Sequence, residues 1–86
     1  MPIVSKFYGI VIRMFQLRNF GARFHAIYEN CELVVNLWPL QIISGDAPRR
    51  VQDMVLEWGT QHQQELLLAW HRVQSGEAPN TIPPLQ

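Results

Sequence analysis

The sequence predicts a small α+β domain, in which an antiparallel β-meander of three to four strands is followed by a long or bent C-terminal helix packed on one face. The first half of the chain is rich in β-branched and aromatic residues that alternate with a period of two, whereas the apolar residues of the second half recur every three or four positions. A chain of 86 residues is also too short for two separate cores. We therefore expect one domain over residues 1–76 and a proline-rich tail over residues 77–86.

The β half of the chain contains up to four strand-like segments. They are residues 7–15 (FYGIVIRMF), 23–28 (RFHAIY), 31–37 (CELVVNL) and 40–44 (LQIIS). The first is apolar on both faces apart from Arg13, which is typical of a central strand. The second places Arg23 and His25 on one face and apolar residues on the other. Trp38 and Pro39 separate the last two strands, because proline cannot donate a hydrogen bond to a β-ladder.

The α half is predicted to be a helix over residues 48–75. One stripe of this helix contains Val51, Val55, Trp58, His62, Leu66, Ala69 and Val73. Gly59 interrupts the pattern and costs about 1 kcal/mol relative to alanine in a helix, so we expect a bend or a break there. On this stripe, we expect His62 to be a neutral core ring that makes one hydrogen bond.

Charge is distributed unevenly, although the net charge is zero. Residues 1–28 contain Lys6, Arg13, Arg18 and Arg23 and no acidic residue. If the protein binds a phosphate group, this segment is the expected place, with Arg18 and Arg23 as the predicted contacts.

Other features of the composition disfavour several classes of protein. Cys31 is the only cysteine, so an internal disulfide and a cysteine zinc site are excluded, and a buried, unreactive thiol is expected. We find no spacing of metal ligands and no glycine-rich phosphate loop, and we predict no metal and no cofactor. No apolar run approaches the ~20 residues of a membrane span, and the start of the chain (MPIVSKFYG) lacks the features of a secretory signal. The expected location is the cytoplasm, with no membrane partner. RNA is a possible partner that the sequence does not favour.

The hairpin around Trp38 is the predicted partner-binding surface. Residues 33–45 (LVVNLWPLQIISG) contain no charged side chain, and an uncharged edge strand invites pairing with another chain. Tryptophan is unusual at a hairpin tip and enriched in interface hot spots. We predict that Trp38, Leu40, Ile42 and Phe20 contact a neighbouring protein or a second copy of this chain. Core packing of the hairpin alone and base stacking by Trp38 are the alternatives.

The second candidate site is centred on His25. Arg23 lies on the same strand face, and Arg13 joins them if the first two predicted strands pair antiparallel. Histidine as acid or base, with arginines that hold a phosphate, is the arrangement of a metal-independent ribonuclease. However, no carboxylate stands near His25 in the sequence to orient the imidazole. We therefore expect a structural role, in which a neighbour satisfies the ring on a mixed strand face, and we leave enzymatic activity open.

Several segments along almost the whole chain match one known family. They are MPIVSKFYGIVIRMF at the start, FHA at 24–26, PRR at 48–50, EW at 57–58, His62, ELL at 65–67, Trp70 and an I-x-P-L ending at 82–85. On these residues the chain resembles the bacterial family called domain of unknown function 4160. The resemblance implies that the chain is encoded beside a second small protein, in an arrangement like a toxin–antitoxin pair.

Two functional hypotheses follow. The leading one is a small protein-binding component of a bacterial two-gene, toxin–antitoxin-like module that acts through its apolar hairpin and sheet edge. The alternative is a metal-independent endoribonuclease toxin that uses His25 with Arg13 and Arg23.

Residues 18–25 (RNFGARFH) depart from the family pattern Asp-His-Asn-Pro-Pro-His-Phe-His, because Arg18 replaces the acid and Arg23 replaces a histidine. A mechanism that requires histidines at both position 23 and position 25 therefore lacks the first of them here.

Overall fold

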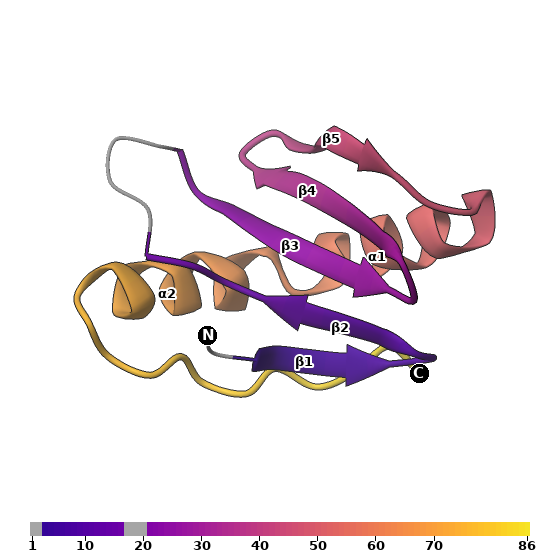
Figure 1. The fold of residues 1–86 in the computed structure, drawn as a ribbon. Coiled ribbons are helices and arrows are strands. Elements are labelled where there is room, and N and C mark those ends of the chain that lie inside the picture. Colours follow the sequence, from indigo (N-terminus) through magenta and orange to yellow (C-terminus); the bar gives the residue numbers. More distant parts are fainter. Residues whose placement is uncertain (1–2, 17–20) are drawn as a thin grey trace.

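The computed structural model describes residues 3–16 and 21–86, which form a five-stranded antiparallel sheet and two C-terminal helices (Figure 1). The strands are β1 Ile3–Phe7, β2 Ile10–Arg13, β3 Arg23–Tyr28, β4 Cys31–Leu37 and β5 Leu40–Asp46, and each pairs with the next one along the chain. The helices are α1 Arg49–Gln61 and α2 Gln63–Gln74. The predicted α+β class and meander order are confirmed. The predicted number of strands, three to four, is wrong, because the sheet has five. The prediction of one helix is also wrong, because the structure has two.

The additional strand arises from a turn inside the apolar segment 7–15. Tyr8 and Gly9 have φ angles of 50° and 80° and connect β1 to β2 as a two-residue hairpin turn. Such turns need positive φ at both central positions, which glycine adopts readily. Tyrosine is a strand-favouring residue, so its presence at the turn conceals this hairpin in the sequence pattern.

The break in the helical half lies at His62 and not at Gly59. The φ and ψ angles of His62 are −121° and 25°, which separates α1 from α2. Gly59 lies inside α1, where a Cβ atom would stand 3.1 Å from Cδ1 of Leu40 on β5. The glycine therefore serves the close approach of α1 to the sheet.

The core lies between the sheet and the two helices. Apart from His62, which keeps 15% of its side chain exposed, the predicted helical stripe is buried: Val51, Val55, Trp58, Leu66, Ala69 and Val73. The strands contribute Val4, Phe7, Ile10, Ile12, Phe24, Ala26, Leu33, Val35 and Leu37. The period of two in residues 23–28 and 31–37 and the helical period predicted these parts of the layer, whereas Val4 precedes the first predicted strand.

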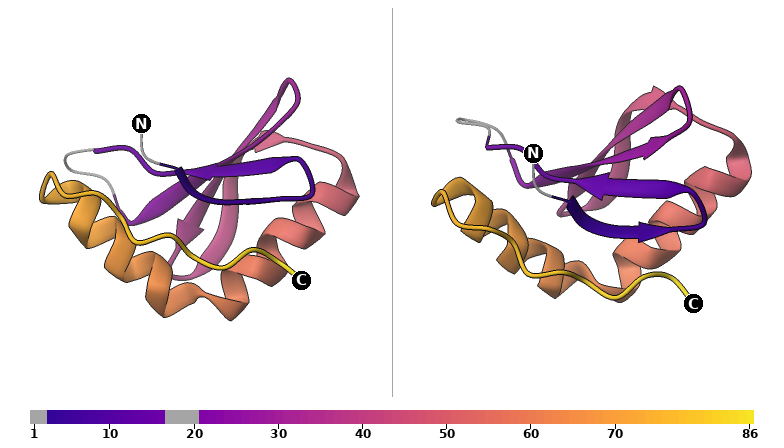
Figure 2. Two further views of the ribbon diagram at one scale, coloured as in Figure 1. Left: turned by 90° about the horizontal axis from the view of Figure 1, so that it is seen from below. Right: turned by 60° about the horizontal axis from the view of Figure 1, so that its bottom comes forward.

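The C-terminal tail is extended and packs on the domain (Figure 2). Ile82 and Leu85 are buried, and the Ile82 backbone N–H donates a hydrogen bond of 2.9 Å to the Val4 carbonyl oxygen. The Trp58 indole N–H donates to the Pro83 carbonyl oxygen at 2.8 Å. The tail thus runs beside β1, whereas β5 forms the other edge of the sheet.

Only one face of the sheet is covered by helices. Figure 2 shows both helices and the tail on the same side of the strands. The opposite face, which we call the open face, contains the side chains that alternate with the core residues. Within residues 3–16 and 21–86, neither helix has both the length and the apolar character that a membrane span requires.

Candidate functional site

The open face brings together the three residues of the predicted His25 site. Arg13 on β2 is directly opposite His25 on β3, and Arg23 precedes His25 by two residues on the same face. All three residues are half-buried. The antiparallel pairing that the sequence hypothesis required is therefore present. The predicted phosphate contact Arg18 lies outside the described residues.

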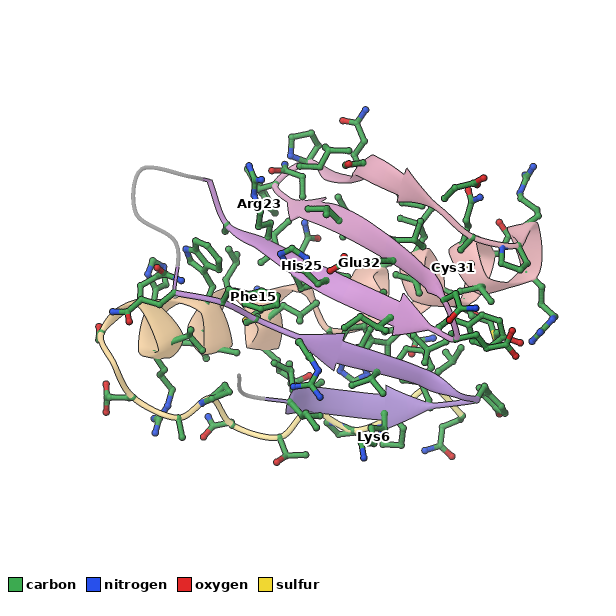
Figure 3. The ribbon with its side chains drawn as sticks, viewed as in Figure 1. Lys6, Phe15, Arg23, His25, Cys31 and Glu32 are labelled. Carbon is green, nitrogen blue, oxygen red and sulfur yellow. The ribbon has the colours of Figure 1, made fainter. Side chains whose placement is uncertain are left out.

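Glu32 on β4 is a hydrogen-bond partner of His25 on this face. Nδ1 of His25 and Oε2 of Glu32 are 2.9 Å apart (Figure 3). Because an ionised carboxylate only accepts hydrogen bonds, Nδ1 carries the proton and donates it. In the neutral ring this leaves Nε2 as the nitrogen with a lone pair. The carboxylate therefore fixes both the orientation and the tautomer of the imidazole.

The remaining nitrogen of His25 is enclosed. Nε2 is buried and has no hydrogen-bond partner within the part of the chain that the structure describes. The ring of Phe15 packs edge-to-face against the imidazole, with centroids 4.4 Å apart and an interplanar angle of 77°. A general base must come within about 2.6–3.2 Å of the group it deprotonates. In this conformation Nε2 is closed to a substrate, and the ring links β3 to β4 instead.

Sequence reasoning did not find Glu32, because it considered only carboxylates near His25 along the chain. The two-residue turn after Tyr28 pairs that residue with Cys31 and pairs Ile27 with Glu32. Glu32 consequently lies diagonal to His25, at a separation that long side chains can span. The register of this short hairpin was the signal that could have revealed the pair.

The tip of the β4–β5 hairpin projects Trp38 into solvent. Its exposed fraction is 74%, the highest among the large hydrophobic residues of the described chain. The predicted contacts Leu40 and Ile42 are placed differently, because they pair with Leu37 and Val35 on the core side and are half-buried. Ile43 is the apolar residue that β5 exposes, at 44%.

Phe20, the fourth predicted partner contact, lies outside the described residues. Cys31, at the start of β4, is half-buried rather than buried.

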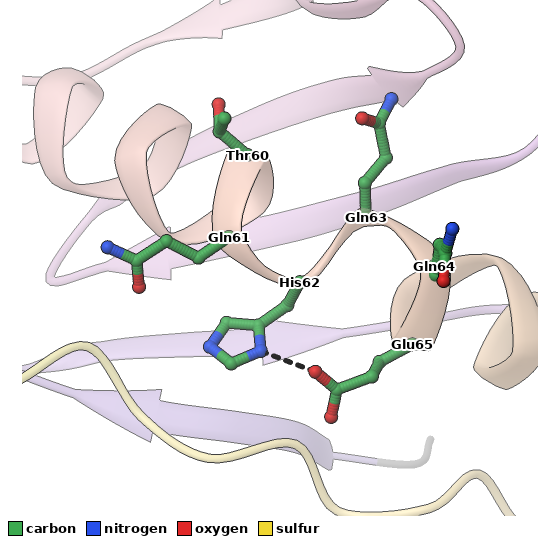
Figure 4. A pocket seen from close by; sticks show the side chains of 6 residues that line it. All are labelled: Thr60, Gln61, His62, Gln63, Gln64 and Glu65. Atoms are coloured by element: carbon green, nitrogen blue, oxygen red, sulfur yellow. Dashed lines mark hydrogen bonds and ion pairs between the residues drawn. The ribbon is translucent and has the colours of Figure 1, made fainter.

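A polar hollow of about 390 Å³ lies at the junction of α1 and α2 (Figure 4). Its lining is Thr60, Gln61, His62, Gln63, Gln64 and Glu65. His62 Nδ1 is 2.6 Å from Glu65 Oε1, and the His62 ring lies 5.6 Å from that of Trp58, centroid to centroid. His62 makes the expected hydrogen bond, but its side chain lines this hollow and keeps 15% of its surface exposed, so it is not a core ring. Among the described residues, no three His, Cys, Asp or Glu side chains are grouped so that they could hold a metal ion.

Comparison with known proteins gives one result. The model of the family "Domain of unknown function (DUF4160)" matches residues 9–71, from the β1–β2 turn into α2. The searches of curated proteins and of solved structures each returned no match. The match includes His25, Glu32 and Trp38, but the family description states no activity. Because the match covers well over half of the chain, the protein belongs to the DUF4160 family.

Proposed function

We propose that this chain is a small protein-binding component of a bacterial two-gene module of the toxin–antitoxin type. It binds its partner through the edge of β5 and the adjoining hairpin tip. The observation that carries the proposal is the exposed Trp38 at the end of an edge strand. The two-gene context rests on the family resemblance alone.

The two edges of the sheet differ in a way that favours β5 as the binding edge. The C-terminal tail runs beside β1 and is hydrogen-bonded to Val4. On β5, residues 41–46 are exposed apart from the half-buried Ile42, and Asp46 at its end is the only charged residue. Soluble proteins usually protect exposed edges with charges, prolines or a covering segment. An extended segment of a partner can therefore add to β5 through main-chain hydrogen bonds.

Trp38 supplies the apolar anchor beside that edge. A side chain with 74% exposure contributes little to the core of its own domain. In protein interfaces, tryptophan side chains that fill a partner's pocket are among the commonest hot spots. The combination of an open edge and an exposed anchor supports a partner that contributes both a strand and a pocket.

Replacing Trp38 by serine is expected to weaken partner binding about 30-fold or more, the effect of losing a hot spot of at least 2 kcal/mol. The melting temperature is expected to stay near that of the parent, because the ring lies outside the core. Binding is measured by titration against the protein encoded by the neighbouring gene, with size exclusion to confirm co-elution.

Tyr8→Ser is the matched control, since Tyr8 is an aromatic residue with 59% exposure at the opposite hairpin tip. If Trp38→Ser lowered stability as much as binding, Trp38 would be a core residue. Equal losses of binding in the two variants would place the interface elsewhere.

A second candidate function is a metal-independent endoribonuclease that uses His25 with Arg13 and Arg23. The Glu32–His25 hydrogen bond favours it, because a carboxylate that orients a histidine is a recurring element of general-base catalysis. The enclosure of Nε2 argues against it. The protein-binding proposal requires no movement of the described residues and is therefore preferred.

Replacing His25 by alanine is expected to change no chemistry and to lower the free energy of unfolding by about 1–2 kcal/mol. This cost reflects the lost edge-to-face contact with Phe15 and the lost pair with half-exposed Glu32. The measurements are denaturant unfolding and incubation with RNA in the presence of a chelator. RNA cleavage by the parent that disappears in a stably folded His25→Ala variant would instead establish the ribonuclease.

A further inference from the structure

Three basic residues cross the open face on a diagonal. Lys6 on β1 pairs with Val11, and Arg13 lies two residues further along β2. Arg13 in turn pairs with His25, and Arg23 lies two residues before it on β3. Each step therefore crosses one strand and shifts by two residues, a diagonal separation of about 7–8 Å. The result is a basic diagonal of Lys6, Arg13 and Arg23, whose two ends, Lys6 and Arg23, are labelled in Figure 3.

Apolar side chains lie between and beside these cations. Val11, Ile27 and Val34 belong to the same face and are half-buried. Ile3, which pairs with Arg13, is 40% exposed. The open face of β1–β4 therefore has an apolar floor bordered by positive charge.

The acidic side chains of this face belong to β4 and β5. Glu32 on β4 bonds to His25, and Asp46 pairs with Glu32 at the end of β5, where it accepts the Ala47 backbone N–H. Residues 1–28, which include β1 to β3, contain no acidic residue. Strands β1 to β3 therefore contribute basic but no acidic side chains to the open face, although the net charge of the chain is zero.

We propose that the basic diagonal binds the phosphate backbone of a single-stranded nucleic acid, whose bases rest on the apolar floor. Lysine and arginine at regular spacing can follow a backbone, whereas the floor requires bases that are not paired in a duplex. The site is distinct from the β5 edge and Trp38, so a protein partner and a nucleic acid can bind together. It also requires no access to Nε2 of His25.

Binding is tested by fluorescence anisotropy with a labelled single-stranded DNA of about 12 nucleotides, within the site sizes of known single-strand binders. DNA lacks the 2′-hydroxyl group that a metal-independent ribonuclease uses as its nucleophile, so the measurement is independent of cleavage. With three phosphate contacts, a plot of log K against log salt concentration is expected to have a slope of about −2.

The matched pair of variants is Lys6→Gln and Arg49→Gln. Both remove one positive charge from an exposed residue, but Arg49 begins α1 on the covered side of the sheet and its side chain is 85% exposed. Lys6→Gln is expected to make the slope of log K against log salt concentration less negative by about 0.7, because one phosphate contact is lost. Arg49→Gln is expected to leave the slope unchanged, and both variants are expected to melt like the parent.

Four results would overturn the proposal. The first is no binding of single-stranded DNA at low salt. The second is an equal effect of both variants, which would indicate diffuse attraction, and the third is equal affinity for a duplex of the same sequence. Inorganic phosphate is expected to compete no better than sodium chloride of equal ionic strength. Stronger competition would assign the site to a small phosphate compound and would also contradict the proposal.

Discussion

Replacing Trp58 by alanine is expected to lower the free energy of unfolding by about 3–5 kcal/mol, much of the stability of a domain this small. The side chain is fully buried at the centre of the core. Its ring lies 5.2 Å from that of Phe7 on β1 and 5.7 Å from that of Phe24 on β3, centroid to centroid. Its indole N–H also bonds to the tail at Pro83. One residue of α1 therefore holds the sheet and the tail together.

Denaturant unfolding of three variants separates these contributions. Trp38→Ala removes a tryptophan that is 74% exposed and is expected to change stability by less than about 0.5 kcal/mol, as surface substitutions usually do. Trp58→Phe keeps an aromatic ring but loses the donor to Pro83, and an intermediate loss is expected. A Trp58→Ala variant as stable as the parent would contradict the packing of α1 described above.

The parts of the fold that sequence predicted best are those with a clear periodic pattern. The stripe from Val51 to Val73 follows helical spacing, and its buried residues lie in the core. The hairpin of β3 and β4 alternates with a period of two on both sides of its turn. Where the apolar residues of one helix or strand form a continuous face, that face is also the one buried in the core, and the prediction succeeds.

Breaks inside such patterns were harder to place, because the same residue type can serve different purposes. Gly59 was expected to interrupt the helix, but it allows Leu40 to approach α1. Gly9, in contrast, does mark a turn, and the flanking Tyr8 conceals it. The break between α1 and α2 at His62 has no glycine or proline directly beside it, so helix propensity alone gives no signal there.

The candidate site was predicted only in part, because it depends on contacts between strands. Arg13, Arg23 and His25 were placed together from strand periodicity and one assumed pairing. Glu32 and Phe15 came from the structure, since their approach to His25 depends on the register and on how the chain leaves β2. These two residues change the interpretation of His25, because one orients the ring and the other packs against it.

The tail is the segment whose role the sequence indicated least. Extended, proline-rich residues have no periodic pattern, so an attached tail and a disordered one look alike in sequence. Burial of Ile82 and Leu85 depends on the surface beside β1 and α1, which exists only in the folded domain. The tail is therefore expected to contribute stability that residues 1–76 lack.

Replacing Ile82 by alanine is expected to lower the free energy of unfolding by about 2–4 kcal/mol, because the side chain is almost fully buried. Thr81→Ala is the control, since Thr81 is its exposed neighbour. Removing residues 77–86 is expected to cost at least as much, because the Trp58 N–H then also loses its acceptor. Thermal and denaturant unfolding of the three variants measure these effects.

Truncation is also expected to change association, because it uncovers the side of β1 along which the tail runs. An unprotected edge strand favours pairing with other chains, so the shortened protein should elute earlier as its concentration is raised. Ile82→Asp in the full chain separates the two effects: a buried charge should detach the tail without removing it. If both variants eluted and melted like the parent, the tail would contribute neither stability nor protection of β1.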